Sequence, residues 1–381
     1  MIYYLSQWLL DAVGGTVWAD WLSPLRVFRY ITVRSAGAAV TALALSWWLG
    51  PKVITWLKEL KFEQAYEDRA QEQGDLKARE LSKKGVPTMG GVLIVMVVDL
   101  TALLWAQWNA LVVLTLVSML VLGALGFWDD YLKITRKDSF GASEHVKLVV
   151  QFALAFFIAL YLLRTPETRP LVADVMVPFL NHPLVTSAVV GVLVTVFAIV
   201  GSSNAVNLTD GLDGLAIGCT LIVTLVFVVF TYIAGNAVIA RYLLVPHVAG
   251  AGELTVFCSA MVGAGLGFLW FNCHPAQVFM GDTGSLALGG VLGITAVLIH
   301  QPFVLVIAGG VFVAEAGSVL LQRGWFKYTR RKHGEGRRIF LMAPLHHHFQ
   351  KLGWYESQVV TRFYILCLLC AVVALSTLKL R

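Results

Sequence analysis

The chain has 381 residues, of which 58% are hydrophobic and only 14% are charged. A soluble globular chain carries about a quarter of charged residues, so this composition excludes an ordinary water-soluble protein. The formal net charge of +6 reflects mainly how basic residues divide between loops, and we expect no nucleic-acid partner.

The N-terminal residues 1–28 are expected to form a segment that lies at the membrane interface. The stretch Met1–Val13 is apolar, but no basic residue occurs before Arg26, so the charged start of a signal peptide is missing. Trp8, Trp18 and Trp21 are typical of interfacial segments, where indole rings settle.

Long apolar runs then divide the chain into ten candidate membrane spans. A spanning helix needs roughly 20 apolar residues, and several runs are shorter, so their ends are expected to extend into the loops. The eighth and ninth runs are separated only by His300, Gln301 and Pro302, which fits either one broken helix or two helices joined tightly. The runs are Ile31–Leu49, Val92–Trp108, Ala110–Phe127, Leu148–Leu163, Val185–Val200, Leu215–Ala234, Leu254–Phe271, Leu286–Ile299, Phe303–Leu321 and Val359–Leu378. The sequence therefore predicts an all-α polytopic membrane protein with about ten transmembrane helices, in a single domain of residues 1–381.

The loops between these runs differ strongly in basic residues. Loops 50–91, 128–147, 201–214, 272–285 and 322–358 hold 20 Lys or Arg residues in total, and the alternate loops and termini hold 7. Basic residues concentrate on the cytoplasmic side of membrane proteins. We therefore expect the first set to be cytoplasmic and both termini to lie outside, in the periplasm.

The first cytoplasmic loop ends with residues that could approach a phosphate. Lys83 and Thr88 are potential phosphate contacts, and Pro87, Gly90 and Gly91 allow a tight backbone approach. A helix start preceded by positive-inside lysines explains the same residues, and that explanation is favoured when this loop is considered alone.

The second loop opens with Asp129 and Asp130, directly after an apolar run. Two adjacent carboxylates repel each other unless a cation lies nearby, and Mg²⁺ takes hard oxygen ligands that it shares with phosphates. A solvated acidic cap is the alternative, but acids at the C-terminal end of a helix meet an unfavourable dipole. Tyr131 and Lys133 follow the two acids, and Lys147, which opens the next span, is a candidate phosphate contact.

The third loop, 201–214, has no Lys or Arg but contains Asn207, Asp210, Gly211 and Asp213. The two aspartates share a face if the next helix starts there. A turn rich in Gly and Asp is the alternative explanation.

The fourth loop contains Asn272, Phe279 and Asp282, and the last precedes a span. An acid at a helix start is commonly a cap, but Asp282 could also join Asp129 and Asp130 around one metal ion. Phe279 could stack on a base.

The fifth loop carries the three consecutive histidines His346, His347 and His348. Adjacent residues cannot easily surround one zinc ion, because zinc sites space their ligands, and imidazoles beside a diphosphate fit better. Two acids fall inside spans and could mark a transport path: Glu315, which we expect to line the inner cavity, and Asp99, which this pattern does not explain.

Aspartates that hold magnesium, ringed by lysines and histidines, suit a diphosphate substrate. Five ordered stretches carry a more specific resemblance: Gly85–Gly91, Asp129–Lys133, Asn204–Gly214, Gln277–Gly284 and Pro344–Phe349. They resemble the polyprenyl-phosphate N-acetylhexosamine-1-phosphate transferase superfamily, and the histidine run resembles its phospho-N-acetylmuramoyl-pentapeptide transferase family.

The resemblance implies UDP-N-acetylmuramoyl-pentapeptide as the donor, undecaprenyl phosphate as the acceptor, and lipid I and UMP as products, in peptidoglycan synthesis. It also implies Mg²⁺ as cofactor, a homodimer, and a multi-pass location in the bacterial cytoplasmic (inner) membrane. Asp282 would be a magnesium ligand, with Asp129 and Asp130 near the metal and the acceptor phosphate, and these three with His346 would be catalytic. The implied substrate-binding residues are Lys83, Thr88, Lys133, Lys147, Asn207, Asp210, Gly211, Asp213, Asn272, Phe279, Gln322, His347 and His348. Of these, Asn207, Asp210, Gly211 and Phe279 would hold the uridine part of the donor. One departure is Gln350, where the family pattern leads us to expect an acid.

Three other interpretations remain open at the level of sequence. A sister transferase would use UDP-N-acetylglucosamine, although the histidine run favours the pentapeptide donor. A secondary transporter also carries charged residues in its spans, but here the acids cluster at one face. A non-catalytic lipid-binding scaffold is the third.

Overall fold

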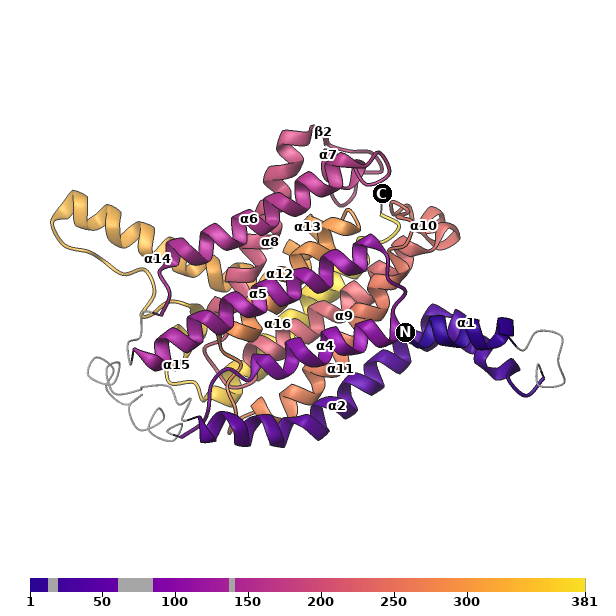
Figure 1. The fold of residues 1–381 in the computed structure, drawn as a ribbon. Coiled ribbons are helices and arrows are strands. Elements are labelled where there is room, and N and C mark those ends of the chain that lie inside the picture. The colour runs from indigo at the N-terminus through magenta and orange to yellow at the C-terminus, as the bar shows by residue number, and fades with distance from the viewer. Residues whose placement is uncertain (13–19, 61–84, 137–140, 381) are drawn as a thin grey trace.

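The structure is a computed structural model that describes residues 1–12, 20–60, 85–136 and 141–380. Nearly all of its regular structure is helical, as the sequence predicted (Figure 1). The elements in order are α1 (Ile2–Ala12), η2 (Ser23–Arg29), α2 (Ile31–Glu59), α4 (Gly91–Trp105), α5 (Ala110–Thr135), α6 (Glu144–Arg164), α7 (Pro170–Ala173), β1 (Asp174–Val175), β2 (Val185–Thr186), α8 (Ala188–Thr209), α9 (Leu215–Gly235), α10 (Ala237–Leu243), α11 (Gly252–Asn272), α12 (Gly281–Leu298), α13 (Pro302–Ala308), α14 (Gly310–His333), α15 (Leu345–Lys351) and α16 (Glu356–Ser376).

Within the described residues, eight helices are long and apolar enough to cross a membrane: α2, α5, α6, α8, α9, α11, α12 and α16. The other two predicted spans correspond to the shorter apolar helix α4 and to the pair α13–α14, which bends by 84° at Gly309. The break that the sequence placed at His300–Pro302 lies between α12, which ends at Leu298, and α13, so the two runs are separate helices; the bend at Gly309 was not predicted. The sequence did not predict the small antiparallel pair of β1 and β2, in which Asp174 faces Thr186.

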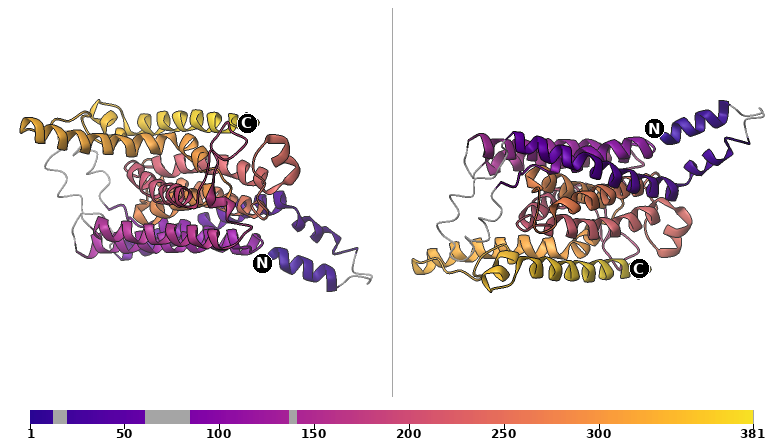
Figure 2. Two further views of the ribbon diagram at one scale, coloured as in Figure 1. Left: turned by 90° about the horizontal axis from the view of Figure 1, so that it is seen from above. Right: turned by 90° about the horizontal axis from the view of Figure 1, so that it is seen from below.

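Helix α12 lies at the centre of the bundle and is almost completely buried. It packs closely on α5, because Gly126 of α5 has no side chain where a Cβ atom would lie 2.2 Å from the backbone oxygen of Asp282. Figure 2 shows the C-terminal helices α14 and α16 along one side of this centre and α5 along the other. Small residues let helix backbones approach in this way where both surfaces are apolar.

A buried ion pair joins the helices at the end of the bundle where the chain begins. Arg34 of α2 donates from Nη2 to Oε1 of Glu253 in α11 at 2.7 Å, and the backbone N–H of Gln107 donates to Oε2 at 2.8 Å. Arg34 and Glu253 are 1% and 6% exposed. Arg34 lies inside the first apolar run, Ile31–Leu49, and Glu253 compensates its charge there.

Both marked ends of the chain lie at the same end of the bundle, opposite the end that carries α15 (Figures 1 and 2). At the α15 end, several helices continue beyond their apolar runs: α5 extends to Thr135, α8 to Thr209 and α14 to His333. Asp129, Lys133 and Asn207, which the apolar runs left in loops, therefore lie on helices, as the expected extension of the spans into the loops allows. Hydropathy marks where apolar residues stop, which is not where the backbone stops being helical.

Candidate active site

The last turns of α5 and α8 and the first turns of α6 and α12 meet at the α15 end of the bundle. Asp129 and Asp130 come from α5, and Asp282 comes from α12. One carboxylate oxygen from each lies within 4.8 Å of those from the other two. The structure thus brings together the three acids that the sequence proposed as a metal site.

Asp130 holds the start of α12. Its Oδ2 accepts hydrogen bonds from the backbone N–H and the hydroxyl of Thr283 at 3.0 and 2.9 Å, and its Oδ1 accepts from the backbone N–H of Asp282 at 3.2 Å. Unpaired N–H groups at a helix start attract such acceptors. Asp130 therefore caps α12 from another helix. The sequence allowed Asp282 either as a cap or as a metal ligand, and with Asp130 as the cap the Asp282 side chain is available to the site.

Two lysines lie between the carboxylates. Lys133 Nζ is 2.6 Å from Asp129 Oδ2 and 3.1 Å from Asp282 Oδ2, while Lys147 Nζ is 2.9 Å from each of these two oxygens. Lys133 reaches Asp129 because the two stand one helical turn apart on α5. Both ammonium groups thus bridge Asp129 and Asp282.

The remaining oxygens of the two bridged acids are held by neutral donors. Asn207 of α8 donates from Nδ2 to Asp282 Oδ1 at 2.8 Å, and the backbone N–H of Ala142 donates to Asp129 Oδ1 at 2.8 Å. Asp129 is fully buried, and the side chain of Asp282 is 14% exposed. The orientation of both carboxylates is therefore fixed.

These residues fit a hard divalent cation. Three carboxyl groups face two ammonium groups, so the cluster holds more acidic than basic side chains at the edge of the apolar bundle. Magnesium prefers carboxylate oxygens and shares its coordination with substrate phosphates. Asp282 and Asp129 would hold such an ion, and Asp130 would support Asp282 from behind.

Asp210 lies beside this cluster, in the turn 210–214 between α8 and α9. Its carboxylate accepts the backbone N–H of Gly281. Burial, with the negative charges of Asp282 and Asp130, raises the pKa of Asp210 to about 8. The carboxyl group therefore exchanges its proton near neutral pH.

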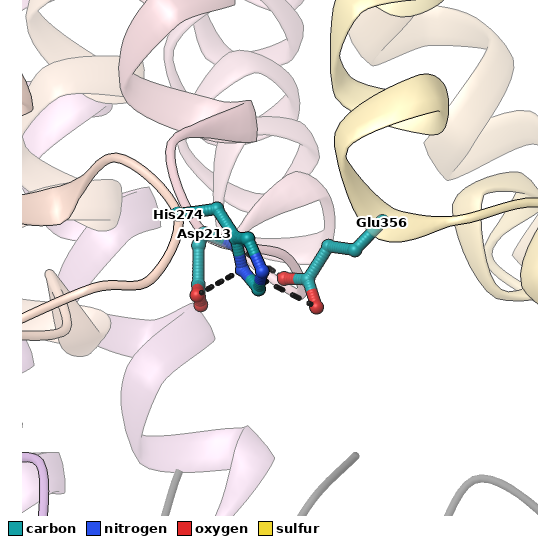
Figure 3. A group of neighbouring side chains, drawn as sticks. All are labelled: Asp213, His274 and Glu356. Carbon is teal, nitrogen blue, oxygen red and sulfur yellow. Dashed lines mark hydrogen bonds and ion pairs between the residues drawn. The ribbon is translucent and has the colours of Figure 1, made fainter. Parts of the chain in front are cut away.

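Asp210 and Asp213 both precede α9, which begins only at Leu215, so the condition under which the two acids would share a helical face is not met. Figure 3 shows Asp213 and Glu356 on either side of the His274 ring. His274 Nδ1 lies 3.0 Å from Asp213 Oδ2 and 4.0 Å from Glu356 Oε2, and the N–H of Asp213 donates to Glu356 Oε1 at 2.9 Å. We call these three residues the bracket, since they join the turn, the loop after α11 and the start of α16.

Two predicted substrate-binding residues have their side-chain amides engaged with the backbone. Asn272 donates to the carbonyl of Val278 at 2.8 Å and accepts the N–H of Gly214 at 3.1 Å. Gln322 of α14 donates to the carbonyl of Phe340 at 3.0 Å and accepts the N–H groups of Ile339 and Phe340. Both amides thus fix loops around the site.

The first motif is joined to the fourth by backbone hydrogen bonds. The N–H of Phe279 donates to the carbonyl of Pro87, and the N–H of Gly90 donates to the carbonyl of Phe279, each at 2.8 Å. Thr88 is buried and Phe279 is half-buried in this arrangement. Lys83 lies outside the described residues.

The three histidines occupy the short helix α15 and have different surroundings. His346 is fully buried and lies 3.2 Å from the carboxylate of Glu315. His347 Nδ1 lies 2.9 Å from Gln350 Oε1, so the residue that departs from the family pattern contacts this ring. His348 Nδ1 accepts the N–H of Leu341 at 3.2 Å. Of the three, His346 lies against the turn 210–214, where a Cβ atom on Gly211 would be 2.3 Å from its Nε2.

Sequence reasoning missed several polar partners. Thr283 and Ser285 lie one and three positions after Asp282, and their hydroxyls at a helix start were an available signal. Glu356 likewise lies at the start of a helix, just before the last apolar run, and its position was a signal of the same kind. His274 and Ala142 gave no local signal, because their partners lie elsewhere in the chain.

The chain is similar to known transferases over its full length. Residues 112–300 match Glycosyl transferase family 4, and residues 83–95 match Phospho-N-acetylmuramoyl-pentapeptide-transferase signature 1. The Phospho-N-acetylmuramoyl-pentapeptide-transferase of Methylacidiphilum infernorum is 48% identical over 385 residues, covering 100% of both chains. That of Opitutus terrae is 51% identical over 367 residues, covering 95% of this chain and 98% of its own. This chain therefore belongs to the phospho-N-acetylmuramoyl-pentapeptide-transferase family.

Proposed function

We propose that this chain transfers phospho-N-acetylmuramoyl-pentapeptide from its UDP-linked donor to undecaprenyl phosphate, forming lipid I and UMP in peptidoglycan synthesis. The observation that carries the proposal is the meeting of Asp129, Asp130 and Asp282 with Lys133 and Lys147 at one end of an apolar bundle. A charged site where an apolar bundle ends suits one soluble and one lipid substrate. Family membership supports the pentapeptide donor over UDP-N-acetylglucosamine, and it supports an enzyme over a transporter or a scaffold.

The cofactor that fits this site is Mg²⁺, held by Asp282 and Asp129. When bound, it neutralises the charge of the diphosphate oxygens. Lys133 and Lys147 would bind phosphate oxygens once the cation takes over the neutralisation of the two carboxylates. Asn207 and Asp130 orient Asp282 throughout.

The contacts of the acids favour direct attack by the acceptor. Asp129 is engaged by Lys133, Lys147 and the N–H of Ala142, and Asp130 accepts three hydrogen bonds from the start of α12. In this arrangement each oxygen of the two carboxylates faces an ammonium group or a hydrogen-bond donor, and with the cation bound Asp129 would be one of its ligands. A phosphate monoester has a second pKa of about 6, so the acceptor is largely dianionic at neutral pH. Its oxygen forms a bond to the sugar-linked phosphorus, the bond from that phosphorus to the bridging oxygen breaks, and UMP leaves with the electron pair.

This scheme exchanges one diphosphate linkage for another, so it is reversible. Labelled UMP should enter the donor when acceptor lipid is present, and it should not without that lipid. Trapping a phosphorylated aspartate would contradict direct attack.

The proposed topology is a multi-pass protein of the bacterial cytoplasmic membrane with ten spans, counting α4 and the bent pair α13–α14. The excess of basic residues on the loops of the α15 end supports a cytoplasmic site and periplasmic termini. Impermeant labelling of single cysteines introduced at the two ends of the bundle tests this orientation. The homodimer implied by the family is a further prediction, which the mass of the protein in detergent tests.

The experiment that tests the function uses the purified full chain with UDP-N-acetylmuramoyl-pentapeptide, undecaprenyl phosphate and Mg²⁺. We expect release of UMP and a lipid-linked product, both of which stop when a chelator is added. The same assay with UDP-N-acetylglucosamine should release little UMP. Equal activity with both donors would favour the sister transferase, and no UMP with either would refute the proposal.

A further inference from the structure

Glu315 is a fully buried acid on α14, the helix that follows the 84° bend. Its Oε1 accepts the backbone N–H of His346 at 3.1 Å and lies 3.2 Å from Nδ1 of the same residue. Its other oxygen, Oε2, has no hydrogen-bond partner among the described residues. A carboxylate without compensation is costly to bury, and the imidazole of His346 is the polar group that the structure places beside it.

The opposite edge of the same imidazole lies against the turn 210–214. Gly211 leaves room for it, because a Cβ atom there would lie 2.3 Å from Nε2 and 3.0 Å from Cε1. One ring therefore has the buried carboxylate of α14 on its Nδ1 side and the turn that carries Asp210 on its Nε2 side. His346 is fully buried between the two.

A carboxylate facing Nδ1 fixes how an imidazole is oriented and which nitrogen carries the proton. The proton stays on the nitrogen that faces the carboxylate, and the other nitrogen is then presented to whatever lies opposite. In a rigid pair of this kind, the acid acts only through the histidine.

We propose that Glu315 is a positioning residue for donor binding, which holds the His346 ring so that its Nε2 edge supports the turn 210–214. The inference rests on the proposed function, because the family resemblance assigns the uridine part of the donor to this turn. The pair of Glu315 and His346 links α14, which contributes no residue to the acid cluster, to the turn 210–214.

The test is a double-mutant cycle in the full-length protein with Glu315→Gln, His346→Gln and both together. Glutamine keeps an acceptor for the backbone N–H of His346 but removes the charge. We expect Glu315→Gln to raise the KM for the donor about tenfold, the size of one lost charge-assisted contact, and to change the KM for undecaprenyl phosphate less than about twofold. In the His346→Gln background, Glu315→Gln should change the donor KM by less than about twofold, because coupled residues are not additive.

The matched control is Asp99→Asn, which removes a buried acid from α4. We expect this variant to keep the donor KM of the unaltered protein. Each unfolding temperature is measured first, and if Glu315→Gln fails to fold, Glu315→Asp replaces it, because it keeps the charge but shortens the side chain by one methylene.

The positioning role would be overturned in an active enzyme if Glu315→Gln raised the donor KM equally with His346 present and with His346→Gln. It would also be overturned if Glu315→Gln raised the KM values for the donor and for undecaprenyl phosphate equally. If the unaltered protein released no UMP from either donor, the proposed function would fail, and this inference with it.

Discussion

Lys147 and Asp282 are 135 positions apart in the chain, yet Lys147 Nζ lies 2.9 Å from Asp282 Oδ2. Each residue occupies the first turn of its helix, α6 for the lysine and α12 for the acid. The same ammonium group also lies 2.9 Å from Asp129 Oδ2. The lysine thus compensates two acids that the proposed cation would also compensate.

Replacing Lys147 by Gln should make the stability of the protein more dependent on Mg²⁺. The change removes one of the two ammonium groups that compensate the buried carboxylates. We therefore expect the free energy of unfolding without Mg²⁺ to fall by about 1–3 kcal/mol. Saturating Mg²⁺ should restore most of that loss, because a bound ligand stabilises the folded state. Thermal unfolding with EDTA and with Mg²⁺ measures both effects. The exposed Lys332→Gln on α14 is the control, and an identical response of the two variants to Mg²⁺ would contradict the account.

Gly211→Ala should be poorly tolerated because of His346. The new Cβ atom would lie 2.3 Å from Nε2 of the ring, so the turn or the helix α15 must move. Forcing extra volume into a packed site costs about 1–3 kcal/mol, which a lower unfolding temperature and lower activity would report. Gly201→Ala is the control, since its Cβ meets nothing within 4 Å. Adding His346→Ala to Gly211→Ala should recover part of the lost stability, and the absence of any recovery would argue against this contact.

His274→Gln should weaken donor binding by loosening the bracket. The ring lies between Asp213 and Glu356 with its side chain 45% exposed, and a partly exposed ion pair contributes up to about 1 kcal/mol. The KM for the donor should therefore rise no more than about fivefold, with kcat nearly unchanged. His182→Gln, between β1 and β2, is the matched control. A donor KM equal to that of the control would show that the bracket does not position the donor site.

Much of the architecture could be predicted because apolar runs determine where helices can span a membrane. The acids of the site were also visible, since Asp129 and Asp130 directly follow one apolar run and Asp282 precedes another. Two kinds of information were missing from the sequence. The first is the continuation of α5 past its apolar run, which puts Lys133 one turn from Asp129 and cannot be predicted from hydropathy.

Contacts between distant segments formed the second gap. The cap that Asp130 provides for α12 joins residues 153 positions apart, and the pairing of Asp213 with Glu356 joins residues 143 apart. Only the packing of the helices brings such residues together. Local patterns therefore identified the polar residues but left open which of them bind each other.

Glu253→Gln should destabilise the end of the bundle opposite the site. The substitution leaves the guanidinium of Arg34 buried without its charge partner, and breaking a buried pair costs about 3–5 kcal/mol. Thermal unfolding should show a clear loss, whereas Arg29→Gln, which removes an exposed contact to Gln7, should show little. An unfolding temperature equal to that of the unaltered protein would mean that the pair does not stabilise the fold.

The most direct test of the central claim is the binding of Mn²⁺, as a paramagnetic substitute for Mg²⁺, followed by electron paramagnetic resonance. The account predicts saturable binding that Mg²⁺ displaces in the unaltered protein and that Asp282→Asn weakens at least about tenfold, while Asp20→Asn, an exposed acid far along the chain from the site, leaves it unchanged. Undiminished Mn²⁺ binding in Asp282→Asn would contradict the claim that Asp129, Asp130 and Asp282 form the metal site.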